Sequence, residues 1–146
     1  MDYRKEAAQE LKDLLKRQNA VSTLREELMD LSGRLTAVKS PCADATPVQG
    51  GSAPIEERTI NLIVKRDELR AMLQTSARRV ARTERALTCL TDQQRDFLTV
   101  FYVDRPRGHV EALMSKYHVE RATVYRIKDE ALRDFTIARY GGLGWG

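Results

Sequence analysis

The sequence predicts an all-α protein: a long N-terminal helical hairpin or coiled coil followed by a C-terminal helix-turn-helix domain. Apolar residues recur at spacings of three and four over two long stretches, and three short amphipathic segments follow them. Residues 2–39 contain no proline and one glycine, whereas residues 40–54 contain three prolines. These changes divide the chain into segments 1–39, 40–54, 55–89, 90–140 and 141–146.

The first segment, 1–39, has the pattern of a coiled-coil helix. Its apolar residues form two rows with heptad spacing, Val21, Leu28 and Leu35 in one and Leu24, Leu31 and Val38 in the other. At 1.5 Å per residue such a helix is roughly 50 Å long. Its apolar stripe is too narrow for a helix in a globular core, so we expect it to pair with another long helix.

The second long helix is expected over 55–89, after a flexible linker at 40–54. Its apolar spacing continues through Leu62, Leu69, Leu73, Val80, Leu87 and Leu90. Between Ile55 and Leu90 eight basic residues oppose five acidic ones, a net charge of +3. Two helices joined by a flexible linker can fold back as an antiparallel hairpin. The same seams could instead pair between chains and form a homo-oligomer, and the sequence leaves both arrangements open.

The apolar pattern of residues 90–140 is typical of a small globular domain. Thr91 and Gln94 have the spacing of a capping box, and Phe97, Leu98, Phe101 and Tyr102 follow on one face. Residues 105–108 predict a turn, and the next helix carries inward residues Val110, Leu113, Met114 and Tyr117. The last helix is expected over 119–135, with Val124, Ile127, Ala131, Leu132 and Phe135 inward. The glycine-rich tail 141–146 is expected to be disordered.

The last two helices, separated by a tight turn around His118, have the helix-turn-helix arrangement. A helix in the major groove needs an apolar inner face and an outer face with hydrogen-bond donors and cations. The candidate DNA-binding residues are Arg121, Thr123, Tyr125, Arg126, Lys128 and Arg133. The alternative is an ordinary amphipathic surface helix.

A second group of basic residues lies on the long helix before this domain. Possible phosphate contacts are Arg78, Arg79, Arg82 and Arg85. The alternative for this group is a solvated helix face that binds nothing.

The stretch "LTDQQRDFLTVFYVDRPRGHVEALMSKYHVERATVYRIKDEALRDF", residues 90–135, resembles region four of bacterial sigma factors. Leu90 and Arg95 fit the opening helix of that module. The positions that fit its final helix are Val119, Arg121, Val124, Ile127, Ala131, Leu132 and Phe135. Phage and prophage regulators are similar in layout, with a helical N-terminal half before this module. The resemblance implies that Arg121, Ala122, Thr123, Tyr125 and Arg126 face the groove.

The sequence departs from the sigma pattern at two groove-facing positions. Ala122 and Thr123 lack the acidic and basic side chains that the family commonly has there. The promoter element of housekeeping sigma factors is therefore not the expected target. No segment resembles the sigma region that reads the other promoter element and melts DNA, so we do not expect a complete sigma factor.

The composition argues against an enzyme, because charged residues make up 32% of the 146 residues and aromatic residues only 6%. A domain this small buries little of its surface, so we expect no deep catalytic pocket. His109 and His118 have no metal-ligand spacing, so no metal or cofactor is expected. Asp129 and Glu130 are expected to be intrahelical charge partners.

The sequence also predicts a cytoplasmic location in a bacterial host. The opening "MDYRKEAAQEL" is charged, and no apolar run is long enough to span a membrane. In a reducing compartment Cys42 and Cys89 would be free thiols, and a disulfide is the alternative.

The function that the sequence predicts is a sequence-specific double-stranded DNA-binding transcriptional regulator of phage or prophage type. The formal net charge of +4 permits nucleic-acid binding. One alternative is a phage DNA-packaging protein similar to a small terminase subunit. Another is an adaptor that binds RNA polymerase through the sigma-like module and has no DNA specificity of its own.

Overall fold

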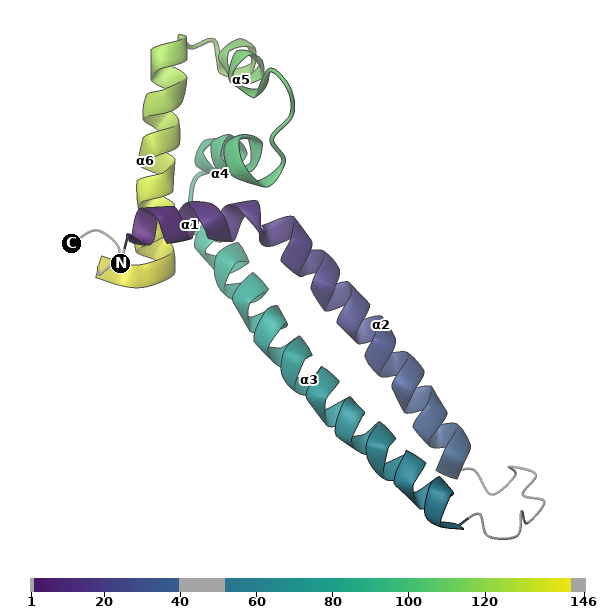
Figure 1. Cartoon of the computed structure of the whole chain (residues 1–146). Helices are drawn as coiled ribbons and strands as arrows, with labels where there is room; N and C mark the ends of the chain where they lie inside the picture. The colour runs from purple at the N-terminus through teal and green to yellow at the C-terminus, as the bar shows by residue number, and fades with distance from the viewer. Residues whose placement is uncertain (1, 40–51, 143–146) are drawn as a thin grey trace. The chain divides into compact units, whose positions relative to one another are not determined.

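The computed structural model describes residues 2–39 and 52–142, and within these ranges the chain contains helices and no strands (Figure 1). The elements are α1 (Tyr3–Lys12), α2 (Leu14–Lys39), α3 (Ser52–Thr88), α4 (Asp92–Leu98), the π-helix η1 (Thr99–Val103), α5 (His109–Tyr117) and α6 (Arg121–Tyr140). The all-α class is confirmed. The chain forms two compact units, one of Met1–Gln18 with Arg78–Gly146 and one of Asn19–Ala77.

The unit Asn19–Ala77 is an antiparallel pair made by α2 and α3 (Figure 1). Leu24, Leu31 and Leu69 are buried at its seam, where three further leucines pack, Leu28, Leu62 and Leu73. These residues belong to the predicted three-four rows, so the seam that the sequence predicts is filled within one chain. Val38 departs from its row, because its side chain is 43% exposed.

The expected continuous helix over 1–39 is wrong at Asp13, where α1 ends and α2 begins. The Asp13 carboxylate accepts a hydrogen bond from Gln9 Nε2 at 3.0 Å and lies 3.6 Å from Arg17 Nη2. Aspartate is a poor helix former in a helix interior. Helix α1 packs against α6 (Figure 1) and against η1.

The first eighteen residues complete the core of the C-terminal domain. Ala7 and Leu11 of α1 are fully buried in one cluster with Leu98, Ala131 and Phe135. Burying a leucine or phenylalanine side chain stabilises a fold by about 1.5–3 kcal/mol. The predicted boundary at 90 is therefore too late, since α1 and the end of α3 form one compact unit with the short helices.

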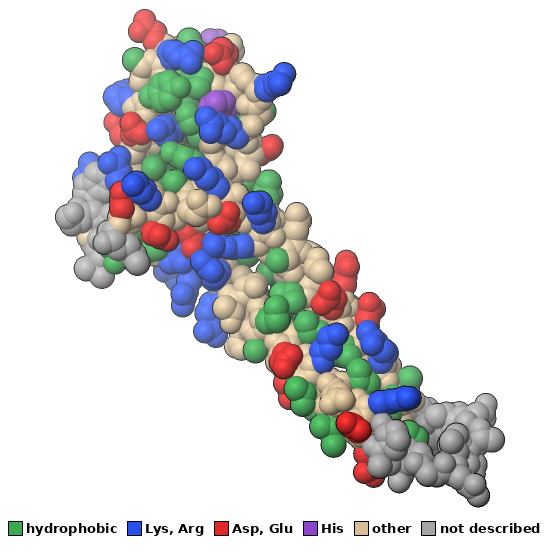
Figure 2. All heavy atoms as spheres, viewed as in Figure 1, with side chains coloured by type: hydrophobic (Ala, Val, Ile, Leu, Met, Phe, Trp, Pro, Cys, Tyr) green, Lys and Arg blue, Asp and Glu red, His purple; other side chains and the backbone are tan. Residues whose placement is uncertain are grey.

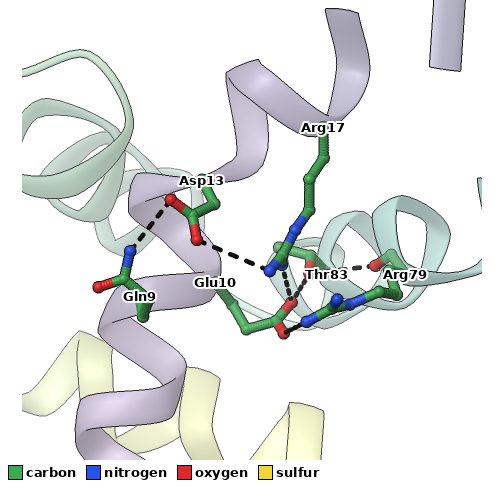
Figure 3. A network of polar contacts seen from close by, with 6 residues as sticks. All are labelled: Gln9, Glu10, Asp13, Arg17, Arg79 and Thr83. Carbon is green, nitrogen blue, oxygen red and sulfur yellow. Dashed lines mark hydrogen bonds and ion pairs between the residues drawn. The ribbon is translucent and has the colours of Figure 1, made fainter. Parts of the chain in front are cut away.

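A buried carboxylate joins α1 to α3 (Figure 3). Glu10 is only 6% exposed, and its Oε2 lies 2.9 Å from Arg17 Nη1 and accepts a hydrogen bond from Thr83 Oγ1 at 3.0 Å. Its Oε1 accepts from Arg79 Nη2 at 3.3 Å. Burial alone would raise the pKa of Glu10, but the Thr83 hydrogen bond and the charges of Arg17 and Arg139 prevail and lower it.

Several helix boundaries in the structure differ from the predicted ones. Helix α3 begins at Ser52, so the last three residues of the expected linker are helical, whereas residues 40–51, with Cys42, lie outside the described residues. The recognition helix begins at Arg121 rather than Val119 and continues to Tyr140. Residues 143–146 of the expected disordered tail are also outside the described ranges. None of the described helices combines the length and apolar character that a membrane span requires.

Candidate nucleic-acid interface

Helix α4 is fixed to the end of α3 by a capping box and an arginine. Thr91 Oγ1 accepts from the Gln94 backbone N–H at 3.2 Å, and Gln94 Oε1 accepts from the Thr91 N–H at 3.1 Å. This confirms the predicted capping box. The Arg95 guanidinium donates to the carbonyls of Leu87 and Leu90 at the end of α3, and the Leu87 carbonyl also accepts from the Leu90 N–H at 3.1 Å. The arginine that fits the sigma-like opening helix therefore caps α3.

The apolar core under the candidate recognition helix joins four elements. The π-helical turn of η1 closes with a hydrogen bond from the Asp104 N–H to the Thr99 carbonyl at 2.7 Å. Five buried residues from α4, η1, α5 and α6 form the cluster, namely Phe97, Phe101, Val110, Leu113 and Val124. The inward residues predicted for the last two helices are buried or partly buried. This core holds the inner face of α6 and leaves its opposite face exposed.

The turn between α5 and α6 is short and well defined. His118 ends α5 in the left-handed region, with φ 54°, and the Val119 N–H donates to the Met114 carbonyl at 3.2 Å. Residues other than glycine rarely adopt this conformation, and histidine is among those that do so more often. Glu120 is extended, and its carbonyl accepts from the Val124 N–H at 3.0 Å. The predicted turn around His118 is confirmed.

The outer face of α6 carries a row of exposed residues. Ala122, Arg126 and Arg133 share this face, because residues four and seven apart in a helix lie on the same side. Arg126 Nη1 lies 3.2 Å from Glu130 Oε1 in an exposed ion pair. Such a pair is weak and screened by salt, so an incoming phosphate or base can replace it.

Arg121, in the first turn of α6, is tied to the preceding helix. Its Nη1 donates to Glu111 Oε1 at 3.1 Å, and both side chains are exposed. A hydrogen bond from the Glu111 backbone N–H, together with the one from Arg121, lowers the pKa of Glu111. The same pair raises the pKa of Arg121. Arg121 therefore stays charged, and a DNA group must compete with Glu111 for it.

Lys128 and Tyr125 lie on the flank of α6 rather than on its outer face. The Lys128 side chain is only 18% exposed, with Nζ 2.7 Å from Asp129 Oδ1 and 5.6 Å from the Phe101 ring centroid. Tyr125 packs edge-on against Phe101 at 5.8 Å and remains 40% exposed. Thr123 is half-buried. The six predicted DNA-binding residues therefore separate into an exposed arginine set and a packed flank.

The four predicted phosphate contacts on α3 also separate. Arg79 points to Glu10 and helps to hold α1, so its first role is in folding. Arg78, Arg82 and Arg85 are exposed. Basic side chains gather beside the C-terminal part of α3 on the face shown in Figure 2.

The sequence reasoning missed the contribution of α1 and of Arg139. Ala7 and Leu11 have the four-residue spacing of a buried helix face, which was a usable signal. Nothing in the sequence indicates that Glu10 contacts Arg79, 69 residues away.

Within residues 2–39 and 52–142 no group of three or more His, Cys, Asp or Glu side chains could hold a metal ion. No family model, curated protein or solved structure matches the chain.

Proposed function

We propose that this chain is a sequence-specific double-stranded DNA-binding protein, a transcriptional regulator of phage or prophage type that acts in the bacterial cytoplasm. The observation that carries the proposal is the α5–turn–α6 pair. Its inner faces share a buried core, and the outer face of α6 presents arginines to solvent. In helix-turn-helix proteins the second helix lies in the major groove, with its apolar face toward the domain and its polar face toward the DNA.

The spacing of the exposed arginines suits a groove. Arg126 and Arg133 are separated by seven residues, a rise of roughly 10.5 Å, close to the major-groove width of about 12 Å. Arg121 and Arg126 lie near the N-terminal end of α6, from which such helices contact base edges. Arginine can donate two hydrogen bonds to the two acceptors of guanine. We therefore assign base contacts to Arg121 and Arg126 and a phosphate contact to Arg133.

The unit Asn19–Ala77 supports self-association. Its seam is filled within one chain, yet Ile60 and Val64 of α3 are 59% and 50% exposed, four residues apart on one face. Met29 and Met72 are also more than half exposed. A dimer built on this apolar face would place two α6 helices in one assembly, as helix-turn-helix proteins do when they bind half-sites about 34 Å apart.

Selection of bound duplexes from a random pool tests the proposal. The wild-type protein should enrich a defined sequence. The double variant Arg121→Ala/Arg126→Ala should enrich a more degenerate sequence or none, because each good bidentate contact discriminates between bases by roughly 5- to 150-fold. Arg58→Ala, at an exposed site in the other unit, is the matched control and should enrich the wild-type sequence.

A wild-type protein that retains DNA without enriching any sequence would overturn the assignment of sequence reading to α6. Equal enrichment by the wild type and the double variant would do the same. Circular dichroism of each variant verifies that the helices are intact.

A further inference from the structure

A basic hollow lies at the end of α6 opposite to the candidate base-reading turn. It has a volume of about 260 Å³ and is lined by Arg82 and Arg85 of α3 and by Ala138 and Arg139 of α6. All four residues belong to the same compact unit. Three arginine side chains therefore converge on one small concave surface.

Arg82 and Arg85 have no acidic ion-pair partner within the described ranges, and Arg139 acts on the Glu10 carboxylate only through its charge, which helps to lower the pKa of Glu10. Arg139 Cζ lies 4.8 Å from the Tyr140 ring centroid, and Arg139 Nε is buried without a hydrogen-bond partner. The nearby Glu10 carboxylate is already held by Arg17, Arg79 and Thr83. Guanidinium groups without an ion-pair partner favour an anion, and an anion with several acceptor oxygens can accept hydrogen bonds from more than one of them.

We propose that Arg82, Arg85 and Arg139 form a binding site for a phosphate group. The planar guanidinium fork matches phosphate oxygens and can donate two parallel hydrogen bonds. Three such groups around one hollow provide both the charge and the directed donors. A single carboxylate has fewer acceptor positions and less charge, so it would satisfy the three guanidinium groups less completely.

The hollow is separate from the base-reading end of α6. Arg121 and Arg139 are eighteen residues apart, which corresponds to a rise of roughly 27 Å and exceeds the major-groove width of about 12 Å. The phosphate can therefore come from DNA that flanks the contacted bases or from a free phosphorylated compound. The first source rests on the proposed function, and the second does not.

Calorimetric titration of the full chain with pyrophosphate, at fixed ionic strength, tests the site. Arg82→Gln/Arg85→Gln removes two exposed lining residues, and Arg58→Gln/Arg70→Gln removes the same charge from exposed sites in the other unit. The lining variant should lose affinity roughly tenfold or more for each arginine, because a hydrogen bond between charged groups contributes more than a neutral one. The control should bind as the wild type does.

Arg139→Gln, with thermal denaturation to verify folding, should give a loss similar to that of one lining arginine. Equal pyrophosphate affinity in the lining and control variants would overturn the site and reduce the hollow to a solvated basic surface. Absence of pyrophosphate binding by the wild type would overturn it as well.

A random-sequence duplex then distinguishes the two sources of phosphate. Displacement of the duplex by pyrophosphate in the wild type, with weaker duplex binding by Arg82→Gln/Arg85→Gln, supports the DNA backbone as the source. Pyrophosphate binding that leaves the duplex in place supports a free phosphorylated compound. Retained pyrophosphate binding without any DNA binding would remove the proposed function and leave the phosphate site standing.

Discussion

Replacing Glu10 by glutamine tests how α1 is held in the compact unit of Met1–Gln18 and Arg78–Gly146. Glu10 is 6% exposed and contacts Arg17, Arg79 and Thr83. Glutamine keeps the shape and one acceptor oxygen but removes the charge. A hydrogen bond to a charged group contributes about 1.5–3 kcal/mol, against about 0.5–1.5 kcal/mol for a neutral one. Arg79 is half exposed, so its share is reduced by solvent. We expect the free energy of unfolding to fall by about 1–2 kcal/mol at pH 7.

The pH dependence of this loss has a defined sign. The pKa of Glu10 is lowered in the folded chain from its ordinary value of 4.5. The stabilisation is therefore present above that unfolded value and is lost as the pH falls through the lower folded value. The difference in unfolding free energy between wild type and Glu10→Gln should stay constant from about pH 7 to about pH 5.5 and shrink below about pH 4.5.

Urea denaturation followed by circular dichroism measures both quantities. Glu6→Gln is the matched control, because Glu6 is an exposed glutamate on the same helix. The control should change the unfolding free energy by less than about 0.5 kcal/mol. Equal values for the two variants at pH 7, or a difference that grows in acid, would refute the role given to the Glu10 network.

Three further outcomes are expected. Leu11→Ala should lower the free energy of unfolding by about 2–5 kcal/mol in urea denaturation, because it opens a cavity under α1, whereas Leu15→Ala, at a 45% exposed side chain, should change it little. Arg78→Gln/Arg82→Gln/Arg85→Gln should make the log–log salt dependence of DNA binding shallower by roughly two to three, with base preference retained. Loss of specific binding alone would place sequence reading on α3. Ile60→Glu/Val64→Glu should shift the protein towards monomer in light scattering, and an unchanged mass would contradict an apolar dimer face.

The elements that repeat a local pattern could be predicted from the sequence. Leu24, Leu31 and Leu69 are buried because the three-four spacing of each helix makes an apolar seam. Thr91 and Gln94 form the predicted capping box because that motif depends only on residues three apart. The turn at His118 could be predicted because it separates two short amphipathic helical segments that lie next to each other in the sequence.

The features that depend on distant contacts could not be predicted in this way. The helical pattern continues through Asp13, so nothing local shows that Ala7 and Leu11 pack against Phe135 rather than extending the hairpin. In the sequence, Arg79 is one of four basic residues close together on α3, and nothing local distinguishes it from Arg78, Arg82 and Arg85. Its role differs because its side chain contacts the buried Glu10. Lys128 belongs to the basic face by sequence, yet the Phe101 and Tyr125 rings hold it on the flank of α6.

The central claim, that α6 reads bases in the major groove, is tested most directly by single 7-deazapurine substitutions in the enriched duplex. Each substitution removes the N7 acceptor of guanine or adenine from the major groove and leaves the minor groove unchanged. Wild-type binding should weaken at one or two purines in each half-site, by less than the roughly 5- to 150-fold of a full bidentate contact because guanine O6 remains. The same purines should be tolerated by Arg121→Ala/Arg126→Ala, because the donors that contact N7 are gone. Uniform tolerance of 7-deazapurines by the wild type, with sensitivity only to minor-groove changes, would contradict the account.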